Sequence, residues 1–108
     1  MRHAFAFALL TLATAASAQT RPPANPYNDR LRALAPDIRH ATLRRAIAEN
    51  GNRCGRVTAA DWRGPYRNLQ RWTVQCTPTG RFGVYIGTDG SVQARACATT
   101  KQLRLPDC

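Results

Sequence analysis

Four cysteines are the residues of this 108-residue chain whose type and spacing point most clearly to chemistry. They are Cys54, Cys76, Cys97 and Cys108, an even set separated by 22, 21 and 11 positions. A structural zinc site usually contains a close pair of thiolates, and the only histidine beyond residue 3, His40, precedes Cys54 by 14 positions. The spacing therefore favours disulfides over a zinc site or a redox-active pair.

Side chains suited to catalysis are scarce. Beyond residue 18 the chain has one histidine, one serine, one lysine and one glutamate, namely His40, Ser91, Lys101 and Glu49. Ser91 follows an Asp-Gly turn, and His40 lies on the apolar side of a helical pattern, which is typical of a half-buried structural histidine. Nucleophilic catalysis needs a nucleophile and a base in contact. We therefore expect no enzymatic activity, no cofactor and no metal site.

The segment from Asp61 to Arg67 is the candidate binding site. It interleaves two aromatic residues with two arginines around a Gly-Pro turn, and these are Trp62, Arg63, Tyr66 and Arg67. Trp, Tyr and Arg are the residues most enriched at the energetic centres of protein interfaces. The alternative interpretation is an ordinary loop between two strands, with Trp62 folded against the core.

The chain is strongly basic, with 16 basic and six acidic residues and a net charge of +10. All the basic residues except Lys101 are arginines. A field of this sign favours acidic partners and anionic surfaces, and salt screens it. We expect an acidic exported protein or an anionic envelope surface as the partner, and no nucleic acid, because an exported protein rarely meets it.

The first 18 residues predict export. Met1-Arg2-His3 is a positive start, and positions 4–16 form an uncharged, mostly apolar run of 13 residues. Ala16-Ser17-Ala18 supplies the small side chains that signal peptidase requires, so we expect cleavage after Ala18. A membrane-spanning helix needs about 20 apolar residues, and no cysteine follows the small residues to carry a lipid anchor. We expect a periplasmic or secreted protein with no transmembrane segment in the mature chain.

The 90 residues from position 19 to 108 suffice for one domain. Positions 19–35 hold three prolines and predict a mobile leader with a short helical turn near its end. A helix is predicted from Pro36, since proline suits the first helical turn, to about Asn50-Gly51, since glycine adopts the left-handed conformation that ends helices. Positions 36–108 are therefore predicted to form a single α+β domain.

From position 53 onward, apolar and polar residues alternate with the period of β-strands. Four short runs result, and turn sequences at 77–80 and 88–90 separate the last three. The residues predicted to share the buried face are Val57 and Ala59, then Trp72, Val74 and Cys76, then Phe82, Val84 and Ile86, then Val92, Ala94 and Ala96. We predict an α+β fold in which one main helix packs on a four-stranded antiparallel meander sheet, stapled by two disulfides.

A meander sheet also restricts the disulfide pairing. It brings Cys54, Cys76 and Cys97 to one end of the sheet, and Cys108 can return there after its short tail. Cys76 shares the core face of Trp72, and Cys54 follows the helix, whereas Cys97 has the opposite parity from the core residues of its strand. Of the three possible pairings we prefer Cys54–Cys76 with Cys97–Cys108.

Between positions 38 and 108 the chain resembles small uncharacterised exported proteins of Gram-negative bacteria with four cysteines. The segments that carry this resemblance are Cys54–Val57, Trp72–Cys76, Val84–Ile86, Asp89–Val92 and Leu105–Cys108. The chain is also similar, at the level of the fold alone, to PepSY-type domains, which lack these cysteines. That second similarity implies a helix on a short antiparallel sheet and the binding or inhibition of proteins, whereas the first implies no activity.

Two classes of function are left open. The first is a non-enzymatic binding or inhibitory module for another envelope protein, which uses the segment at 61–67 or a sheet edge. The alternative is a basic envelope-surface protein that docks on lipopolysaccharide or anionic lipid. Salt distinguishes them, because electrostatic docking weakens more steeply with ionic strength than a complex anchored by aromatic residues.

Overall fold

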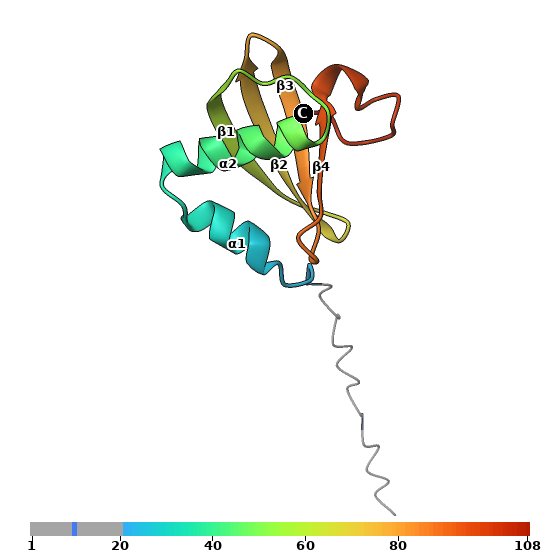
Figure 1. Cartoon of the computed structure of the whole chain (residues 1–108). Helices are drawn as coiled ribbons and strands as arrows, with labels where there is room; N and C mark the ends of the chain where they lie inside the picture. Colours follow the sequence, from blue (N-terminus) through green and yellow to red (C-terminus); the bar gives the residue numbers. More distant parts are fainter. Residues whose placement is uncertain (1–9, 11–20) are drawn as a thin grey trace, which may run out of the picture.

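The computed structural model describes residue 10 and residues 21–108, so the predicted signal peptide and the first residues of the predicted leader lie outside the described part, Leu10 excepted. The described chain folds into two helices, four strands and one 3₁₀ turn (Figure 1). In chain order these are α1 (Pro26–Ala33), α2 (Pro36–Glu49), β1 (Arg56–Tyr66), β2 (Leu69–Thr77), β3 (Gly80–Ile86), β4 (Val92–Ala96) and η1 (Cys97–Thr99). No described helix is long and apolar enough to cross a membrane.

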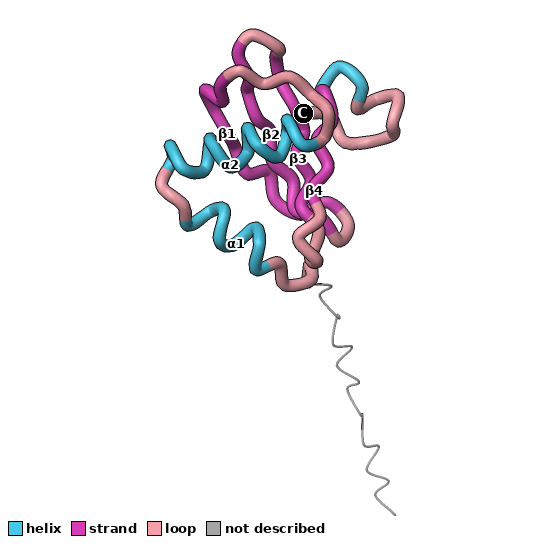
Figure 2. The backbone as a smooth tube through the Cα atoms, in the orientation of Figure 1, coloured by secondary structure: helices cyan, strands magenta, loops and turns pink. Residues whose placement is uncertain are grey.

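The four strands form one antiparallel sheet in the order β1-β2-β3-β4, and both helices lie against the same face of it (Figures 1 and 2). The α+β class and the four-stranded antiparallel meander predicted from the sequence are confirmed. The prediction of one main helix is incomplete, because α1 is a second, shorter helix that also contributes to the core.

The hydrophobic core lies between the helices and this face of the sheet. Leu43 and Ile47 of α2 are almost wholly buried, as are Val74 of β2 and Val84 of β3. Each such side chain contributes about 1.5–3 kcal/mol when it leaves water. The rest of the cluster is Leu31, Cys54, Val57, Trp72, Cys76, Phe82, Ile86 and Ala94. The core faces predicted for β2, β3 and β4 are therefore confirmed.

The predicted start and end of the main helix are also confirmed. Pro36 occupies the first turn of α2, and Asn50 is its C-cap residue. Gly51 follows with a φ of 81°, the left-handed conformation that glycine adopts without steric cost. Beyond the helix, the side-chain amides of Asn50 and Asn52 donate hydrogen bonds to the carbonyls of Val92 and Ala94, at 3.3 and 3.4 Å. The end of α2 thus covers part of the free edge of β4.

Helix α1 is fixed to the sheet by buried amide side chains. Asn25 caps the helix by accepting a bond from the backbone N–H of Asn28, and its own amide donates to the carbonyl of Ile86 at 3.1 Å. The Asn28 oxygen accepts a hydrogen bond of 2.7 Å from the indole N–H of Trp72. The sequence predicted a mobile leader over 19–35 with a short helical turn near its end, whereas the structure has a helix from Pro26 to Ala33 that is held against the sheet. The three prolines and the scarcity of apolar residues suggested an unpacked segment, whereas the amides of Asn25 and Asn28 find partners far away in the sequence.

Strand β1 is longer than predicted and contains two bulges. Its register against β2 shifts between Val57 and Ala59 and again between Trp62 and Gly64. The first bulge reverses the alternation, so that Ala60 joins Val57 on the core side while Ala59 is exposed. The segment 61–67, predicted as a loop, belongs to β1 up to Tyr66.

The two disulfides are Cys54–Cys76 and Cys97–Cys108, with Cα atoms 5.3 and 5.6 Å apart, as preferred from the sequence. The first is buried and joins the end of α2 to β2. The second closes the C-terminal tail onto the end of β4, and Arg71 of β2 also donates a 3.0 Å hydrogen bond to the carbonyl of Asp107. Each crosslink contributes about 3 kcal/mol by restricting the unfolded chain. Disulfides are typical of proteins in oxidising compartments outside the cytoplasm.

We expect Asn28→Ala to lower the free energy of unfolding by about 1–3 kcal/mol, because the buried indole N–H of Trp72 loses its acceptor. Denaturant unfolding of the oxidised protein measures this change. The matched control is Gln93→Ala on the exposed side of β4, which should change stability by less than about 0.5 kcal/mol. If the Asn28 variant is as stable as the control, this hydrogen bond does not hold α1 in place.

Candidate functional site

Arg39 of α2 joins the two helices. Its Nε donates to the carbonyl of Leu31 at 3.1 Å, and its Nη2 donates to the carbonyls of Arg32 and Leu34 at 2.7 and 2.8 Å. These carbonyls belong to the end of α1, where helical oxygens lack intrahelical partners. The guanidinium also lies 5.7 Å from the centre of the Trp72 ring. Arg39 therefore fixes the last turn of α1, which carries Arg32, close to Trp72 of β2.

Arg32 stacks on Trp62. Its guanidinium carbon lies 3.7 Å from the centre of the indole ring, a close cation–π contact. The indole is held from the other direction, because its N–H donates a 3.0 Å hydrogen bond to Oε1 of Gln70 on β2. Trp62 remains 39% exposed, whereas Trp72, its partner in the β1–β2 register, is 2% exposed. One tryptophan thus belongs to the core and the other to the surface.

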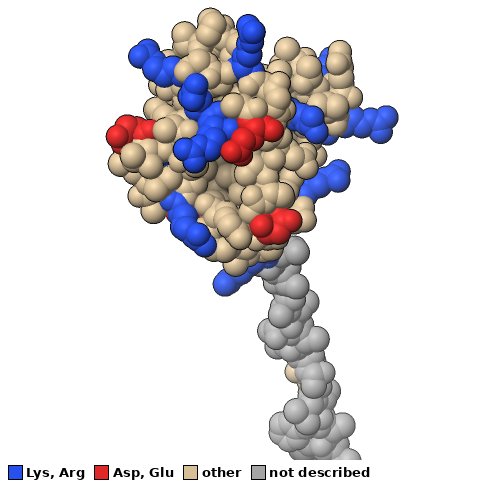
Figure 3. All heavy atoms as spheres, in the orientation of Figure 1, with Lys and Arg blue, Asp and Glu red and all other residues tan. Residues whose placement is uncertain are grey.

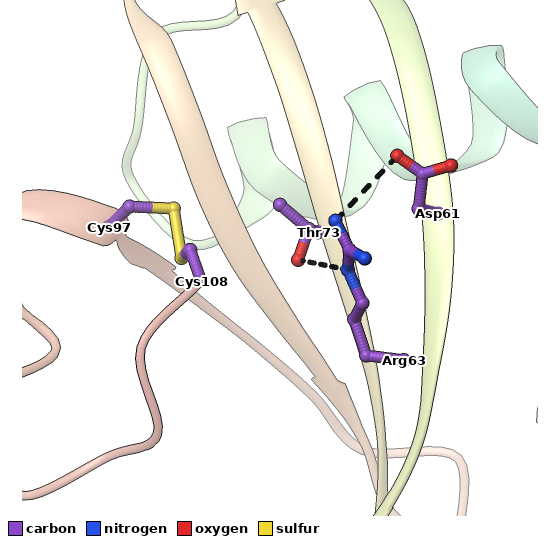
Figure 4. A network of polar contacts seen from close by, with 5 residues as sticks. All are labelled: Asp61, Arg63, Thr73, Cys97 and Cys108. Carbon is purple, nitrogen blue, oxygen red and sulfur yellow. Dashed lines mark hydrogen bonds and ion pairs between the residues drawn. A yellow bond between two sulfur atoms is a disulfide. The ribbon is translucent and has the colours of Figure 1, made fainter.

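An open hollow of about 310 Å³ lies beside this stacked pair. Its charged and aromatic lining consists of Arg32, Arg39, Arg63, Asp61, Trp62 and Trp72. We call this hollow the Arg32–Trp62 notch. The side chains of Asp61 and Arg63 contact each other toward the opposite face of the sheet (Figure 4). The guanidinium groups that make the notch cationic are therefore those of Arg32 and Arg39. Arg39 already donates to three carbonyls, whereas the guanidinium of Arg32 has no hydrogen-bond or ion-pair partner among the described residues. Its donors are free to bind a carboxylate or a phosphate.

Arg63 extends to the other face of the sheet. Figure 4 shows it across the strands with α2 behind them, together with Asp61 and Thr73. Its Nε donates to Oγ1 of Thr73 at 3.1 Å, and its Nη2 lies 4.0 Å from a carboxylate oxygen of Asp61. Asp61 and Arg63 lie on either side of Trp62 at the second bulge of β1, and Thr73 is the register partner of Asp61 on β2. This exposed ion pair is worth less than about 1 kcal/mol, so it positions Arg63 more than it stabilises the domain.

Tyr66 and Arg67 lie at the end of the β1–β2 hairpin. The ring of Tyr66 meets that of Tyr85 edge to face, with the ring centres 6.4 Å apart, and the guanidinium of Arg67 lies 5.6 Å from the centre of Tyr66. Arg67 and Asn68 form the two-residue turn, where Arg67 has a φ of 54°. A hairpin turn of this length commonly needs such left-handed residues.

The four residues predicted as one surface therefore divide into two groups. Trp62 lies on the helix side of β1, whereas Arg63, Tyr66 and Arg67 lie on the opposite side or at the hairpin. The physical reason is the alternation of a strand, which a flexible loop would not have imposed. Arg32, the residue that completes the site of Trp62, was missed because it falls in the segment predicted to be mobile. The signal that identifies its helix is Asn25-Pro26 followed by Leu31 at helical spacing.

Most carboxylates of the described chain are engaged locally, so its arginines other than Arg63 have no ion-pair partner there. Asp29 and Asp37 lie in the first turns of α1 and α2, where they stabilise the helix N-termini. Asp89 accepts hydrogen bonds from the hydroxyl and the backbone N–H of Ser91, which lower its pKa. Within residues 21–108 the Asp61–Arg63 contact is the one ion pair. Figure 3 accordingly shows basic side chains spread over the visible face, with few acidic ones among them.

Comparisons of the chain with protein-family models, curated proteins and solved structures find no match. In the part of the chain that the structure describes, no three His, Cys, Asp or Glu side chains gather as metal ligands would.

Tyr85 of β3 holds the one buried side-chain polar atom without a hydrogen-bond partner among the described residues, its hydroxyl oxygen. The side chain is 2% exposed and lies along the sheet above Gly83. A Cβ atom at position 83 would lie only 3.0 Å from that oxygen, so glycine provides the room it occupies. Burial raises the pKa of Tyr85, and the nearby positive charge of Arg71 opposes the shift in part.

We expect Tyr85→Phe to be as stable as the original protein at neutral pH or more stable by about 1 kcal/mol, because an unsatisfied hydroxyl is removed. With its raised folded-state pKa, Tyr85 should cost stability as the pH rises above about 10, since the unfolded state ionises first. The variant should lose less stability in this range, as measured by unfolding between neutral and alkaline pH. Tyr27→Phe, at an exposed tyrosine, is the control. A clear loss of stability in Tyr85→Phe at neutral pH would show that the hydroxyl has a partner.

Trp62 and Trp72 are expected to respond differently to truncation. Trp72→Ala should cost about 3–5 kcal/mol, because it leaves a large cavity in the core. Trp62→Ala should cost only about 1 kcal/mol, since it removes one exposed cation–π contact and one hydrogen bond. Thermal and denaturant unfolding compare the two variants. Equal and severe destabilisation would make Trp62 a core residue and remove the notch as a recognition site.

Proposed function

We propose that the chain is a non-enzymatic, exported binding module that docks on an acidic protein of the cell envelope through the Arg32–Trp62 notch. Inhibition of that protein is one form that such docking can take. The observation that carries the proposal is the stacking of the Arg32 guanidinium on an exposed tryptophan at 3.7 Å, with its donors unpaired among the described residues. Stacking holds the guanidinium plane without consuming its N–H groups, which suits in-plane recognition of a carboxylate.

The composition of the notch supports a protein partner over a purely electrostatic surface. Trp and Arg are the side chains that most often anchor protein interfaces. Here Trp62 supplies apolar area and Arg32 supplies charge within the same hollow. A lipid surface requires only the positive field, which the chain spreads over many arginines, as Figure 3 shows. Docking on lipopolysaccharide or anionic lipid is the alternative function, and the test below separates the two.

The proposal includes the export of the chain from the cytoplasm. Residues 1–18 have the three parts of a signal peptide, and we place cleavage near Ala18, which leaves a mature protein from Gln19 in the periplasm or the medium. The two disulfides support an oxidising compartment. A binding partner would therefore be another exported or envelope protein.

Capture from a periplasmic extract tests the proposal, with the oxidised chain from Gln19 to Cys108 as bait. We expect a specific protein to be retained at moderate salt, and Arg32→Gln to reduce its retention at least about tenfold, or about 1.4 kcal/mol. Arg81→Gln, which removes an exposed arginine on β3 away from the notch, makes the same change in net charge and is the matched control. Direct binding of the captured protein, once purified, confirms the effect.

The same variants are compared on vesicles of phosphatidylcholine with and without phosphatidylglycerol. Binding to the anionic vesicles that collapses with salt and falls equally in both variants, together with no captured protein, would overturn the proposal in favour of the alternative. Equal retention of a captured protein by Arg32→Gln and Arg81→Gln would also contradict it, because the notch would then play no special part.

A further inference from the structure

The two edges of the sheet differ. At β4, the side-chain amides of Asn50 and Asn52 bond to the strand's carbonyls at 3.3 and 3.4 Å and so occupy part of its edge. At β1, no other segment of the described chain pairs with the outer edge. Every second N–H and C=O of an edge strand points away from the sheet, and such a row of groups can pair with another chain. The open edge of this domain is therefore β1.

The two bulges of β1 define how much of this edge is available. Between them, Ala59, Ala60, Asp61 and Trp62 keep an unbroken register against β2. This stretch is about 13 Å long, enough for a short strand. Bulges distort the edge on either side of it, and Pro65 lacks a backbone N–H. An added strand would thus have one defined position instead of sliding along β1.

The Arg32–Trp62 notch lies on the helix side of this same stretch. Ala60 and Trp62 line the notch, and Arg32 stacks on Trp62 from above the sheet. A strand paired to β1 would place every second side chain beside them, on the same face. A carboxylate there would find the free donors of Arg32, and the hollow of about 310 Å³ has room for it.

The other face of the stretch has a different charge. There Asp61 lies beside Arg63, which it contacts at 4.0 Å and which donates to Thr73. A carboxylate next to Asp61 would be repelled, and the nearest cation already has a carboxylate partner. The two faces therefore select a strand that is acidic on the helix side and neutral on the other.

We infer that the edge of β1 from Ala59 to Trp62 binds an extended acidic segment of the partner as a fifth strand, and that a carboxylate at alternate positions pairs with Arg32 above Trp62. This rests on the proposed function and specifies how its partner is held. A second copy of the chain is a poor occupant, because two strongly basic proteins repel and their Arg32 side chains would meet at the shared edge.

Two synthetic peptides of equal length and charge test the inference. In the first, glutamate alternates with threonine, so that one face of the strand is acidic. In the second, the central threonine is replaced by proline, which removes a backbone donor and opposes strand pairing. Affinity is measured by titration, and hydrogen exchange followed by NMR reports which backbone amides of the oxidised protein become protected.

We expect the alternating peptide to bind at least about tenfold more tightly than the proline peptide and to protect amides within Ala59–Trp62. Arg32→Gln should weaken its binding by at least about tenfold, and Arg81→Gln should have a much smaller effect. Equal binding of both peptides, binding without protection of β1, or no binding of either peptide would each overturn the inference. A concentration-dependent dimer with the same protected amides would also overturn it, by assigning the edge to a second copy.

The peptide experiment and the capture experiment fail independently. If the peptides give a contrary result while an envelope protein is still captured through Arg32, the proposed function stands and only the added strand is rejected. If no protein is captured and vesicles bind instead, the proposed function itself is rejected.

Discussion

The architecture depends on burying the indole of Trp72. This ring fills the centre of the sheet, and its N–H must find an acceptor inside the protein because water cannot reach it. Asn28 of α1 supplies that acceptor. The hydrogen bond that this core side chain needs therefore holds a short, polar helix against the sheet. Arg39 then binds the end of this helix, and Arg32 is carried to Trp62. The hydrogen bond of the buried Trp72 and the Arg32–Trp62 notch at the surface are thus linked through the eight-residue helix α1.

The helix end, the C-terminal tail and the two edges of the sheet are each held or protected in a different way. The disulfide between Cys54 and Cys76 holds the end of α2 to the sheet, and the one between Cys97 and Cys108 holds the tail. The asparagines after α2 cover β4, while β1 is interrupted by bulges instead of being covered. Both are recognised ways of protecting an exposed strand from indiscriminate pairing. They differ in that bulges leave a short stretch accessible.

The parts of this fold that could be predicted are those with local signals. Pro36 and Gly51 mark the ends of α2, alternation marks β2 to β4, and the meander follows from turns such as Asp89-Gly90, which together lead to the correct disulfide pairing. The rest depends on contacts between distant residues. No residue near Asn28 in the sequence indicates that its side chain will accept a hydrogen bond from the buried indole of Trp72. The bulge at Arg63 can be recognised only when β1 and β2 are aligned. Residue type therefore indicated Trp62 as part of the candidate site, but the sequence did not indicate that Arg32 lies against it.

Both disulfides lie within residues 54–108, so neither covalent loop encloses α1 or α2. The Cys54–Cys76 disulfide anchors the chain just after α2, whereas α1 is held to the sheet by packing and hydrogen bonds. Helix α1 buries one asparagine and one leucine, with a second buried asparagine as its N-cap. So few buried residues would allow it to open while the sheet stays folded, as a low-stability cooperative unit. Since Arg32 reaches Trp62 only when α1 is docked, the fraction of molecules with α1 closed sets an upper bound on the competent population. Apparent affinity would then vary with the stability of the helix contacts even when no residue of the binding surface changes.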